Sequence, residues 1–426
     1  MHPVFKPGEP SAVQGMIERH PGACTMVIFG ASGDLAKRKL FPALYNLAKG
    51  NELPEQFAIV GVSRSIPNDS ALREIVRGAL EKFAGEEVDK ATWERLSRCL
   101  YMVTGDVVEE KTYNDLGAAI ERAAKEHGTG KSVLFYLSVP ASSFPEILPR
   151  LKSAKLVHAT GSKDQWTRVI VEKPFGHDIE SAVELNDLAN KTLDESQVFR
   201  IDHYLGKETV QNILAFRFAN SIFEPLWNRK FIDHVQITAA EKIDIEGRGK
   251  FYEETGILRD VVQNHLLQVL ALFAMEPPNA LTAGELRSEK ARMLRAMRPF
   301  ETKNVSQAVV LGQYEGYRDE KDVAKDSQVP TFTALKLFVD NWRWQGVPFY
   351  LRAGKGLKSR VTEIKVVFGN IPLSLFGRAS SDAIRNNILT LRIQPDEGIG
   401  LSFMSKVPGV EFQLANVDMN MRYSQV

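Results

Sequence analysis

Residues 25–36, which read TMVIFGASGDLA, decide the fold of the first half of the chain. A β-branched run ends at Phe29, a turn of glycines and small residues follows, and a helical pattern opens at Leu35. Such a turn lets backbone N–H groups approach a pyrophosphate at a helix N-terminus, where the helix dipole favours negative charge. The residues expected to surround that phosphate are Gly30, Ala31, Ser32, Gly33, Asp34 and Leu35.

The sequence around this turn alternates strand-like runs with helical patterns. The runs lie at 25–29, 57–62, 133–139 and 168–172, and helical patterns follow the first two at 35–49 and 72–83. Because the turn lacks the full Gly-x-Gly-x-x-Gly pattern, this βαβ context is what favours dinucleotide binding. We expect residues 1–202 to form a doubly wound, parallel-sheet α/β domain of the Rossmann type, with strands 133–139 and 168–172 buried on both faces.

The second half of the chain has a different order of predicted elements. Strand-like stretches follow one another with fewer helices between them, which indicates a largely antiparallel sheet. They lie at 234–239, 334–339, 363–368 and 387–394. We expect residues 203–426 to form an α+β domain with a large, mainly antiparallel sheet, and the charged stretch 315–327 to be a surface loop.

Composition argues against several classes of partner. The chain of 426 residues carries 54 basic and 53 acidic side chains, so its formal charge of +1 favours neither nucleic acid nor an anionic membrane. Cys24 and Cys99 form no Cys-x-x-Cys motif, which argues against a disulfide framework and a thiolate metal site. No stretch reads as a signal peptide or a membrane span. We expect a cytoplasmic protein without a metal.

The end of the second strand discriminates between nicotinamide cofactors. An NAD enzyme usually carries an acid there for the ribose hydroxyls, whereas residues 61–65 read GVSRS. The guanidinium of Arg64 complements a 2′-phosphate, so the sequence favours NADP. The alternative is that Arg64 is a solvated loop cation, which is the usual situation of a lone arginine.

Two short segments concentrate groups for proton transfer, namely 200–208 (RIDHYLGKE) and 259–265 (RDVVQNH). Oxidation of an alcohol needs a base for the hydroxyl proton as hydride leaves the carbon, and histidine suits this near neutral pH. Asp202 held against one ring nitrogen of His265 would fix the tautomer of the imidazole. The spacing does not show that the two meet, and purely structural histidines are the alternative.

Other cations suit an anionic substrate. Lys207 offers a compact charge, and His203 and Tyr204 offer hydrogen-bond donors for a phosphoryl group, unless the segment is a helix start with a surface lysine. Lys173 follows a buried-type strand in the sequence VEKPFG, a poor position for lysine unless it faces a ligand. The basic loop 352–360 adds further cations, although most basic loops are solvated.

These segments, in this order, resemble the glucose-6-phosphate dehydrogenase family, most specifically through residues 201–208, and the similarity spans about residues 25–418. The resemblance implies oxidation of D-glucose 6-phosphate at C1 to 6-phosphoglucono-1,5-lactone with hydride transfer to NADP, the first step of the oxidative pentose phosphate pathway. It also implies a dinucleotide-binding domain joined to an α+β domain whose large sheet commonly forms the dimer interface. A homodimer or a dimer of dimers is therefore expected.

The resemblance also assigns matching residues to three groups. The catalytic pair is His265, the general base, and Asp202, its carboxylate partner. The substrate group consists of Lys173, His203, Tyr204, Lys207, Glu241, Asp260, Lys355 and Arg360. The cofactor group consists of the turn residues 30–35, Arg64 as the ligand of the 2′-phosphate, and Lys173, which lies between sugar and cofactor.

Two departures from the family accompany this resemblance. Relatives typically continue with several helices after the position of residue 426, so we expect apolar surface to be exposed in this chain. Some members also hold a second, structural NADP with cations and an aromatic residue, in whose place this chain has Val361, Gly400 and Ser402. One cofactor per subunit is therefore expected.

Two alternatives differ in class. A sugar dehydrogenase of the glucose-fructose oxidoreductase type also joins a similar nucleotide fold to a Glu-Lys-Pro motif, but it does not explain residues 202–208 followed by 260–265. A catalytically silent or truncated sugar-phosphate-binding relative is the other alternative. The presence of Asp202, Lys207 and His265 argues against lost chemistry.

Overall fold

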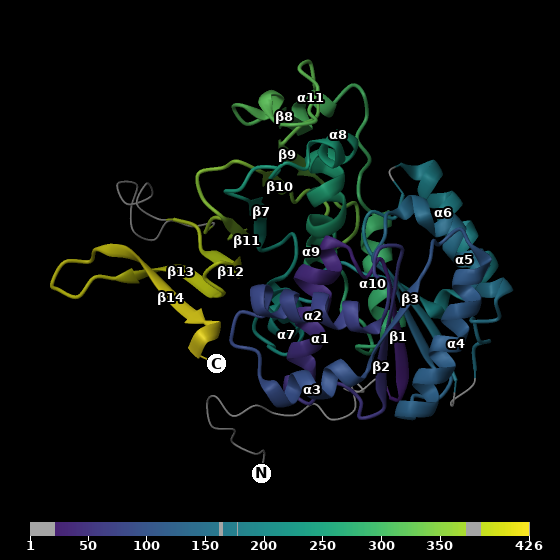
Figure 1. The fold of residues 1–426 in the computed structure, drawn as a ribbon. Helices are drawn as coiled ribbons and strands as arrows, with labels where there is room; N and C mark the ends of the chain where they lie inside the picture. The colour runs from purple at the N-terminus through teal and green to yellow at the C-terminus, as the bar shows by residue number, and fades with distance from the viewer. Residues whose placement is uncertain (1–21, 162–164, 177, 372–384, 426) are drawn as a thin grey trace, which may run out of the picture. The chain divides into compact units, whose positions relative to one another are not determined.

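The computed structural model describes residues 22–161, 165–176, 178–371 and 385–425. The chain divides into two compact units, the first of which ends at Ile201 and the second of which begins at Asp202. Each unit is built on its own sheet (Figure 1). No helix in the described ranges has both the length and the apolar character needed to cross a membrane. The expectation of no signal peptide concerns residues 1–21, which lie outside the described residues.

Six parallel strands form the sheet of the first unit, in the order β3-β2-β1-β4-β5-β6. The strands are β1 (Cys24–Phe29), β2 (Phe57–Ser63), β3 (Leu100–Thr104), β4 (Val133–Leu137), β5 (Thr167–Val171) and β6 (Val198–Arg200). Strand β1 pairs with β2 on one side and β4 on the other, which is the central position it occupies in doubly wound dinucleotide-binding folds. The predicted Rossmann-type fold is confirmed.

Alternate residues of β1 face two apolar clusters on opposite sides of this sheet. Val27 and Phe29 belong to one cluster, together with residues of α4 and α5. Met26 and Ile28 belong to the other, together with residues of α1 and α2. The helices of the unit are α1 (Phe41–Lys49), α2 (Asp69–Phe83), α3 (Lys90–Arg98), α4 (Glu110–His127), α5 (Phe144–Ser153) and α6 (Ile179–Thr192), and a π-helical turn, η1 (Ala36–Leu40), precedes α1.

The second unit contains an eight-stranded sheet in the order β14-β13-β12-β11-β7-β10-β9-β8. Its strands are β7 (Ile232–Ala240), β8 (Val309–Gly312), β9 (Phe332–Leu337), β10 (Phe349–Gly354), β11 (Val361–Phe368), β12 (Ile388–Gln394), β13 (Gly398–Lys406) and β14 (Leu414–Arg422). All neighbours are antiparallel except β7 and β10, which run parallel. The predicted large, mainly antiparallel sheet is confirmed.

One buried helix, α9 (Leu267–Ala274), fills the core of the second unit. The indole N–H groups of Trp227 and Trp344 donate to the carbonyl oxygens of Phe273 and Ala274, at 2.9 and 2.7 Å, and so satisfy acceptors that the end of a helix leaves unpaired. The other helices are α7 (Glu208–Phe218), α8 (Gly249–Ile257), α10 (Ala283–Arg295) and α11 (Val305–Ala308), and a π-helical segment, η5 (Leu258–Leu266), leads from α8 into α9.

One expectation about local structure is wrong. Strand β5 is not buried on both faces, because Arg168 is exposed and its guanidinium lies 4.3 Å from the ring of Trp166. The stretch 315–327 is largely exposed, as expected of a surface loop, although Tyr317 is buried and its hydroxyl donates to Glu253 at 2.6 Å. In β5 the side-chain contact decides the environment, and the run of residue types along the chain does not reveal it.

Candidate active site

The parallel pairing of β7 with β10 gathers several of the predicted residues at one sheet edge. Ala240 lies opposite Gly354 in this pairing, so the residues that follow, Glu241 and Lys355, leave the sheet side by side. The backbone N–H of Glu241 donates to the Gly354 carbonyl at 2.8 Å and fixes their spacing. Strand β11 begins at the same edge, directly after Arg360.

The π-helical segment η5 supplies two more of the predicted residues. In a helix with i to i+5 hydrogen bonds, residues five positions apart lie on the same face, and such segments occur often at functional sites. Asp260 and His265 have this spacing, and η5 packs against β7 and β10. The local winding of the helix therefore directs both side chains to one side.

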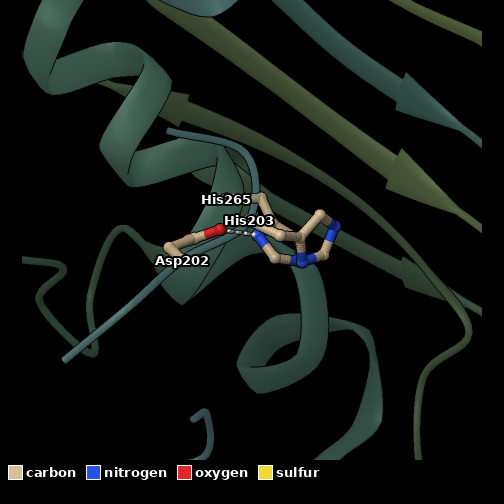
Figure 2. A group of neighbouring side chains, drawn as sticks. All are labelled: Asp202, His203 and His265. Carbon is tan, nitrogen blue, oxygen red and sulfur yellow. Dashed lines mark hydrogen bonds and ion pairs between the residues drawn. The ribbon is translucent and has the colours of Figure 1, made fainter. Parts of the chain in front are cut away.

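Asp202 and His265 meet in a buried pair. Asp202 Oδ1 lies 2.6 Å from His265 Nδ1, and the two side chains are only 10% and 6% exposed (Figure 2). The backbone N–H of Tyr204 donates to the same carboxylate oxygen at 2.9 Å, and the Tyr204 ring stacks on the imidazole at 4.2 Å and 11°. These contacts fix the orientation of the imidazole.

Electrostatics determines which ring nitrogen carries the proton. Burial raises the pKa of Asp202. The hydrogen bond from His265, the positive charge that His265 carries when protonated, and the hydrogen bond from the Tyr204 N–H together hold this pKa below its usual value. An ionised carboxylate only accepts, so Nδ1 of His265 is the donor and Nε2 carries the free lone pair of the neutral ring. The pair is thus arranged for His265 to accept a proton at Nε2.

His203 lies beside this pair at the surface. It is exposed, and its ring centroid is 4.5 Å from that of His265 and 5.2 Å from that of Tyr204. Asp202, His203 and His265 each offer a ligand atom within 4.8 Å of the others, a spacing that a divalent cation could use. The direct hydrogen bond between Asp202 Oδ1 and His265 Nδ1 is the arrangement that acid–base chemistry requires.

Two cations share one neutral amide at the sheet edge. Lys207 Nζ and Arg360 Nη2 both donate to Gln394 Oε1, at 2.9 and 3.1 Å, while Gln394 Nε2 donates to Thr362 Oγ1 at 3.0 Å. Burial and then the charge of Arg360 lower the pKa of Lys207. Two like charges held together by an uncharged acceptor form a site for an anion of more than one negative charge.

The third group surrounds the buried ammonium of Lys355. Its Nζ lies 2.6 Å from Glu241 Oε2 and 3.8 Å from Asp260 Oδ2. Carboxylates in this position are suitable acceptors of hydrogen bonds from hydroxyl groups. The ring of Tyr252 lies 5.9 Å from the ammonium, and its buried hydroxyl has no hydrogen-bond partner among the described residues.

In the first unit, the glycine turn after β1 has a conformation that only glycine can adopt at residue 30. Gly30 has φ of 80°, and a Cβ built there would lie 2.4 Å from the Ser138 carbonyl oxygen. The N–H groups of Gly30 and Ala31 donate to the Val62 carbonyl at 3.0 and 3.2 Å, and that of Gly33 donates to Gly30 at 2.8 Å. The helix that follows begins with N–H groups that have no partner within the helix.

Arg64 lies at the end of β2, as predicted. Its side chain is 79% exposed, and Nη1 lies 3.3 Å from Asp106 Oδ2. Nearby, Ser63 Oγ donates to Ser32 Oγ at 2.8 Å, which joins the strand end to the glycine turn. Lys173 follows β5 and is half-buried in the first unit, whereas the other predicted substrate residues lie in the second unit.

Two family descriptions match the chain almost end to end. "Glucose-6-phosphate dehydrogenase, NAD binding domain" matches residues 27–212, and "Glucose-6-phosphate dehydrogenase, C-terminal domain" matches residues 214–426. The chain belongs to the glucose-6-phosphate dehydrogenase family. Membership makes it an oxidoreductase that acts on glucose 6-phosphate with a nicotinamide dinucleotide.

Individual members of the family are similar over most of their length. A glucose-6-phosphate 1-dehydrogenase of Chlamydia muridarum is 45% identical over 410 residues, which cover 94% of this chain and 81% of that relative. A glucose-6-phosphate 1-dehydrogenase 2 of Mycobacterium tuberculosis is 43% identical, over 96% and 80%. A solved structure of a glucose-6-phosphate dehydrogenase in complex with its substrate glucose-6-phosphate superposes with a TM-score of 0.85 at 36% identity, over 95% of this chain and 82% of that one.

Several residues of the site escaped sequence reasoning. Gln394 is a neutral amide at the end of a predicted strand, and Tyr252 lies in a helix between motifs, so no pattern in the sequence marks either of them. The three positions that differ from the family's second NADP site lie in β11 and β13, where Ser402 Oγ donates to Asp418. A single cofactor in this family member stays a prediction.

We predict that inorganic phosphate stabilises this family member through the Lys207 and Arg360 pair. Phosphate at roughly ten times its Kd should raise the free energy of unfolding by about 1.4 kcal/mol, because only the folded state binds it. Thermal melts with and without phosphate measure the effect. Lys207→Ala should remove most of it, whereas Lys336→Ala, at an exposed lysine of the same unit, should not. An unchanged shift in Lys207→Ala would contradict the assignment of this site.

Proposed function

We propose that the chain oxidises D-glucose 6-phosphate at C1 to 6-phosphoglucono-1,5-lactone with NADP as hydride acceptor, as the first step of the oxidative pentose phosphate pathway. The observation that carries the mechanism is the buried pair in which Asp202 accepts a 2.6 Å hydrogen bond from His265. A carboxylate that fixes the imidazole tautomer and stabilises the imidazolium is the arrangement that a histidine base needs.

In this proposal His265 Nε2 removes the C1 hydroxyl proton of the sugar. The Asp202 carboxylate offsets the positive charge that the imidazole then carries, and Tyr204 keeps the ring from turning. When bound, NADP accepts the hydride that leaves C1. Because the low dielectric of the buried pair strengthens the carboxylate–imidazolium attraction, the protein environment favours the proton transfer.

The remaining residues of the second unit hold the substrate. Lys207 and Arg360 bind the phosphate, with His203 and Tyr204 as further donors, because they form the paired cations that Gln394 joins. Glu241 and Asp260 accept hydrogen bonds from sugar hydroxyls, and the ammonium of Lys355 lies between their carboxylates and holds them in place. Lys173 completes the contact between sugar and cofactor.

The first unit fits the dinucleotide. The first N–H groups of the following helix suit a pyrophosphate, which the turn residues 30–35 would hold, and Gly30 keeps the turn tight because a side chain there would collide with Ser138. Arg64 would bind the 2′-phosphate that distinguishes NADP from NAD, since it is exposed at the end of β2 where the ribose lies in such folds.

The proposal extends to domains, assembly and location. Residues 1–202 carry the cofactor and residues 203–426 carry the substrate site and the dimer interface. Strand β14 supports a homodimer or a dimer of dimers, because nearly all its residues are exposed at the edge of the sheet, Met419 among them. The absence of cysteine pairing supports the cytoplasm, since Cys24 and Cys99 are both free thiols.

We predict that His265→Asn lowers kcat by about two to four orders of magnitude while substrate binding changes much less, the usual effect of removing a positioned general base. Asp202→Asn should also slow turnover, but by less. The double variant should lose little more than His265→Asn alone, because the two residues act as one unit.

Formation of reduced nicotinamide, followed by absorbance and normalised to folded protein, measures all three variants. A folded His265→Asn protein with near-normal kcat would remove the base assignment. In that case His265 would contribute only to packing, and its loss would appear in the melting temperature.

We also predict that Arg64→Ala weakens NADP by about 1.5 to 3 kcal/mol and leaves NAD nearly unaffected, because only NADP offers a phosphate to the guanidinium. Titration of each oxidised cofactor into the variant and the parent protein measures the difference. Arg38→Ala is a matched control, since Arg38 is also exposed and lies on the turn of helix after the glycines. Equal losses for NADP and NAD in Arg64→Ala would refute the assignment.

A further inference from the structure

A half-buried lysine, Lys290, lies on α10 and is not one of the residues assigned to substrate or cofactor. Lys290 Nζ donates to Gln268 Oε1 at 2.9 Å. Within the described part of the chain, its ammonium forms no ion pair with a carboxylate within 4 Å. Partial burial of a lysine ammonium without a direct ion pair lowers the stability of the fold, so such lysines are uncommon.

The hydrogen bond to Gln268 brings Lys290 beside the catalytic pair. Gln268 follows His265 by three positions on the continuous helix formed by η5 and α9, and residues with this spacing lie on the same helix face. Helices α9 and α10 also pack against each other. The ammonium of Lys290 is therefore held against the face of the helix from which His265 projects.

Electrostatic interactions also link Lys290 to Asp202. Burial lowers its pKa, the carboxylate of Asp202 raises it, and Arg287 on the same helix lowers it. Lys290 and Asp202 thus interact as opposite charges, with Asp202 supplying the negative charge that the lysine lacks in its own direct contacts. Both residues belong to the second unit.

One oxygen of the Asp202 carboxylate lacks a hydrogen-bond partner among the described residues. Its Oδ1 accepts hydrogen bonds from His265 and from the Tyr204 N–H, whereas its Oδ2 is buried and has no hydrogen-bond partner among the described residues. An unsatisfied oxygen of a buried carboxylate is costly, and it favours rotation of the carboxylate away from the imidazole. A nearby positive charge offsets this cost.

We propose that Lys290 is a positioning residue of the reaction, whose ammonium, held by Gln268, supplies the positive charge that keeps the Asp202 carboxylate aligned on His265. The inference rests on the proposed function, since it assigns Lys290 a role through the proposed base. Lys290 touches neither sugar nor cofactor in this account. It acts on turnover by keeping Asp202 in the orientation that the imidazolium needs.

The test compares two replacements of Lys290 with a control on the same helix. Lys290→Met keeps the aliphatic length and removes the charge, Lys290→Arg keeps a charge, and Arg292→Gln removes an exposed cation of α10. Steady-state kinetics with glucose 6-phosphate and NADP gives kcat and KM, and thermal melts report the folded state. Each replacement is also made in the His265→Asn background.

We expect Lys290→Met to lower kcat about 10-fold, the effect of losing roughly 1.4 kcal/mol of transition-state stabilisation, with KM for glucose 6-phosphate within about twofold of the parent value. Lys290→Arg should restore kcat to within about threefold, and Arg292→Gln should leave it unchanged, because its charge lies in solvent. In the His265→Asn background, Lys290→Met should cause no further loss.

Three results would overturn the inference. A folded Lys290→Met protein with parental kcat removes the role. An equal loss in the parent and His265→Asn backgrounds shows that Lys290 only joins α10 to α9. Near-normal turnover of His265→Asn itself removes the proposed base, and this result is separate because it requires no change at Lys290.

Discussion

The parallel pairing of β7 with β10 is the constraint on which the site depends. In a sheet whose other neighbours are antiparallel, this one pair makes two strands end at the same edge, so that Glu241 and Lys355 become neighbours. The antiparallel strand β11 starts at that edge, and Gln394 ends β12 opposite Thr362. A parallel connection needs a long crossover, and the chain between β7 and β10 contains the segment η5 that carries Asp260 and His265.

The second organising principle is local neutralisation of buried charge. Two carboxylates lie beside the ammonium of Lys355. The Asp202 carboxylate accepts hydrogen bonds from His265 and from the Tyr204 N–H. The fully buried guanidinium of Arg217 donates to Glu224 and to two carbonyl oxygens. The Lys207 and Arg360 pair is different, because its shared partner Gln394 is neutral. Cations that form no direct ion pair among the described residues are where an anionic ligand lowers the free energy most.

Local patterns in the sequence encode part of the fold. The β-branched runs and the glycine turn predicted β1, β2, β4 and β5 correctly, because burial and close backbone approach restrict residue types at those positions. Strands β3, β6, β8, β10, β13 and β14 were not predicted. The first three are short, and the residues of the other three are mixed in polarity, so that only tertiary pairing makes them strands. The meeting of Asp202 with His265 was a hypothesis from chemistry, and the fold supplies the 2.6 Å contact that no spacing could show. Gln394 and Lys290 were missed because a neutral amide and a helical lysine are unremarkable until their partners are known.

The reaction proposed for this chain is the transfer of hydride from C1 of glucose 6-phosphate to NADP. Glucose 6-phosphate carrying deuterium at C1 follows that hydride, with mass spectrometry of the reduced cofactor and rates for labelled and unlabelled sugar. The deuterium should appear in reduced NADP, and the labelled sugar should be consumed more slowly wherever the chemical step limits the rate. Reduced cofactor that contains no deuterium, or protein that binds the sugar phosphate and forms no reduced cofactor, would rule out this reaction.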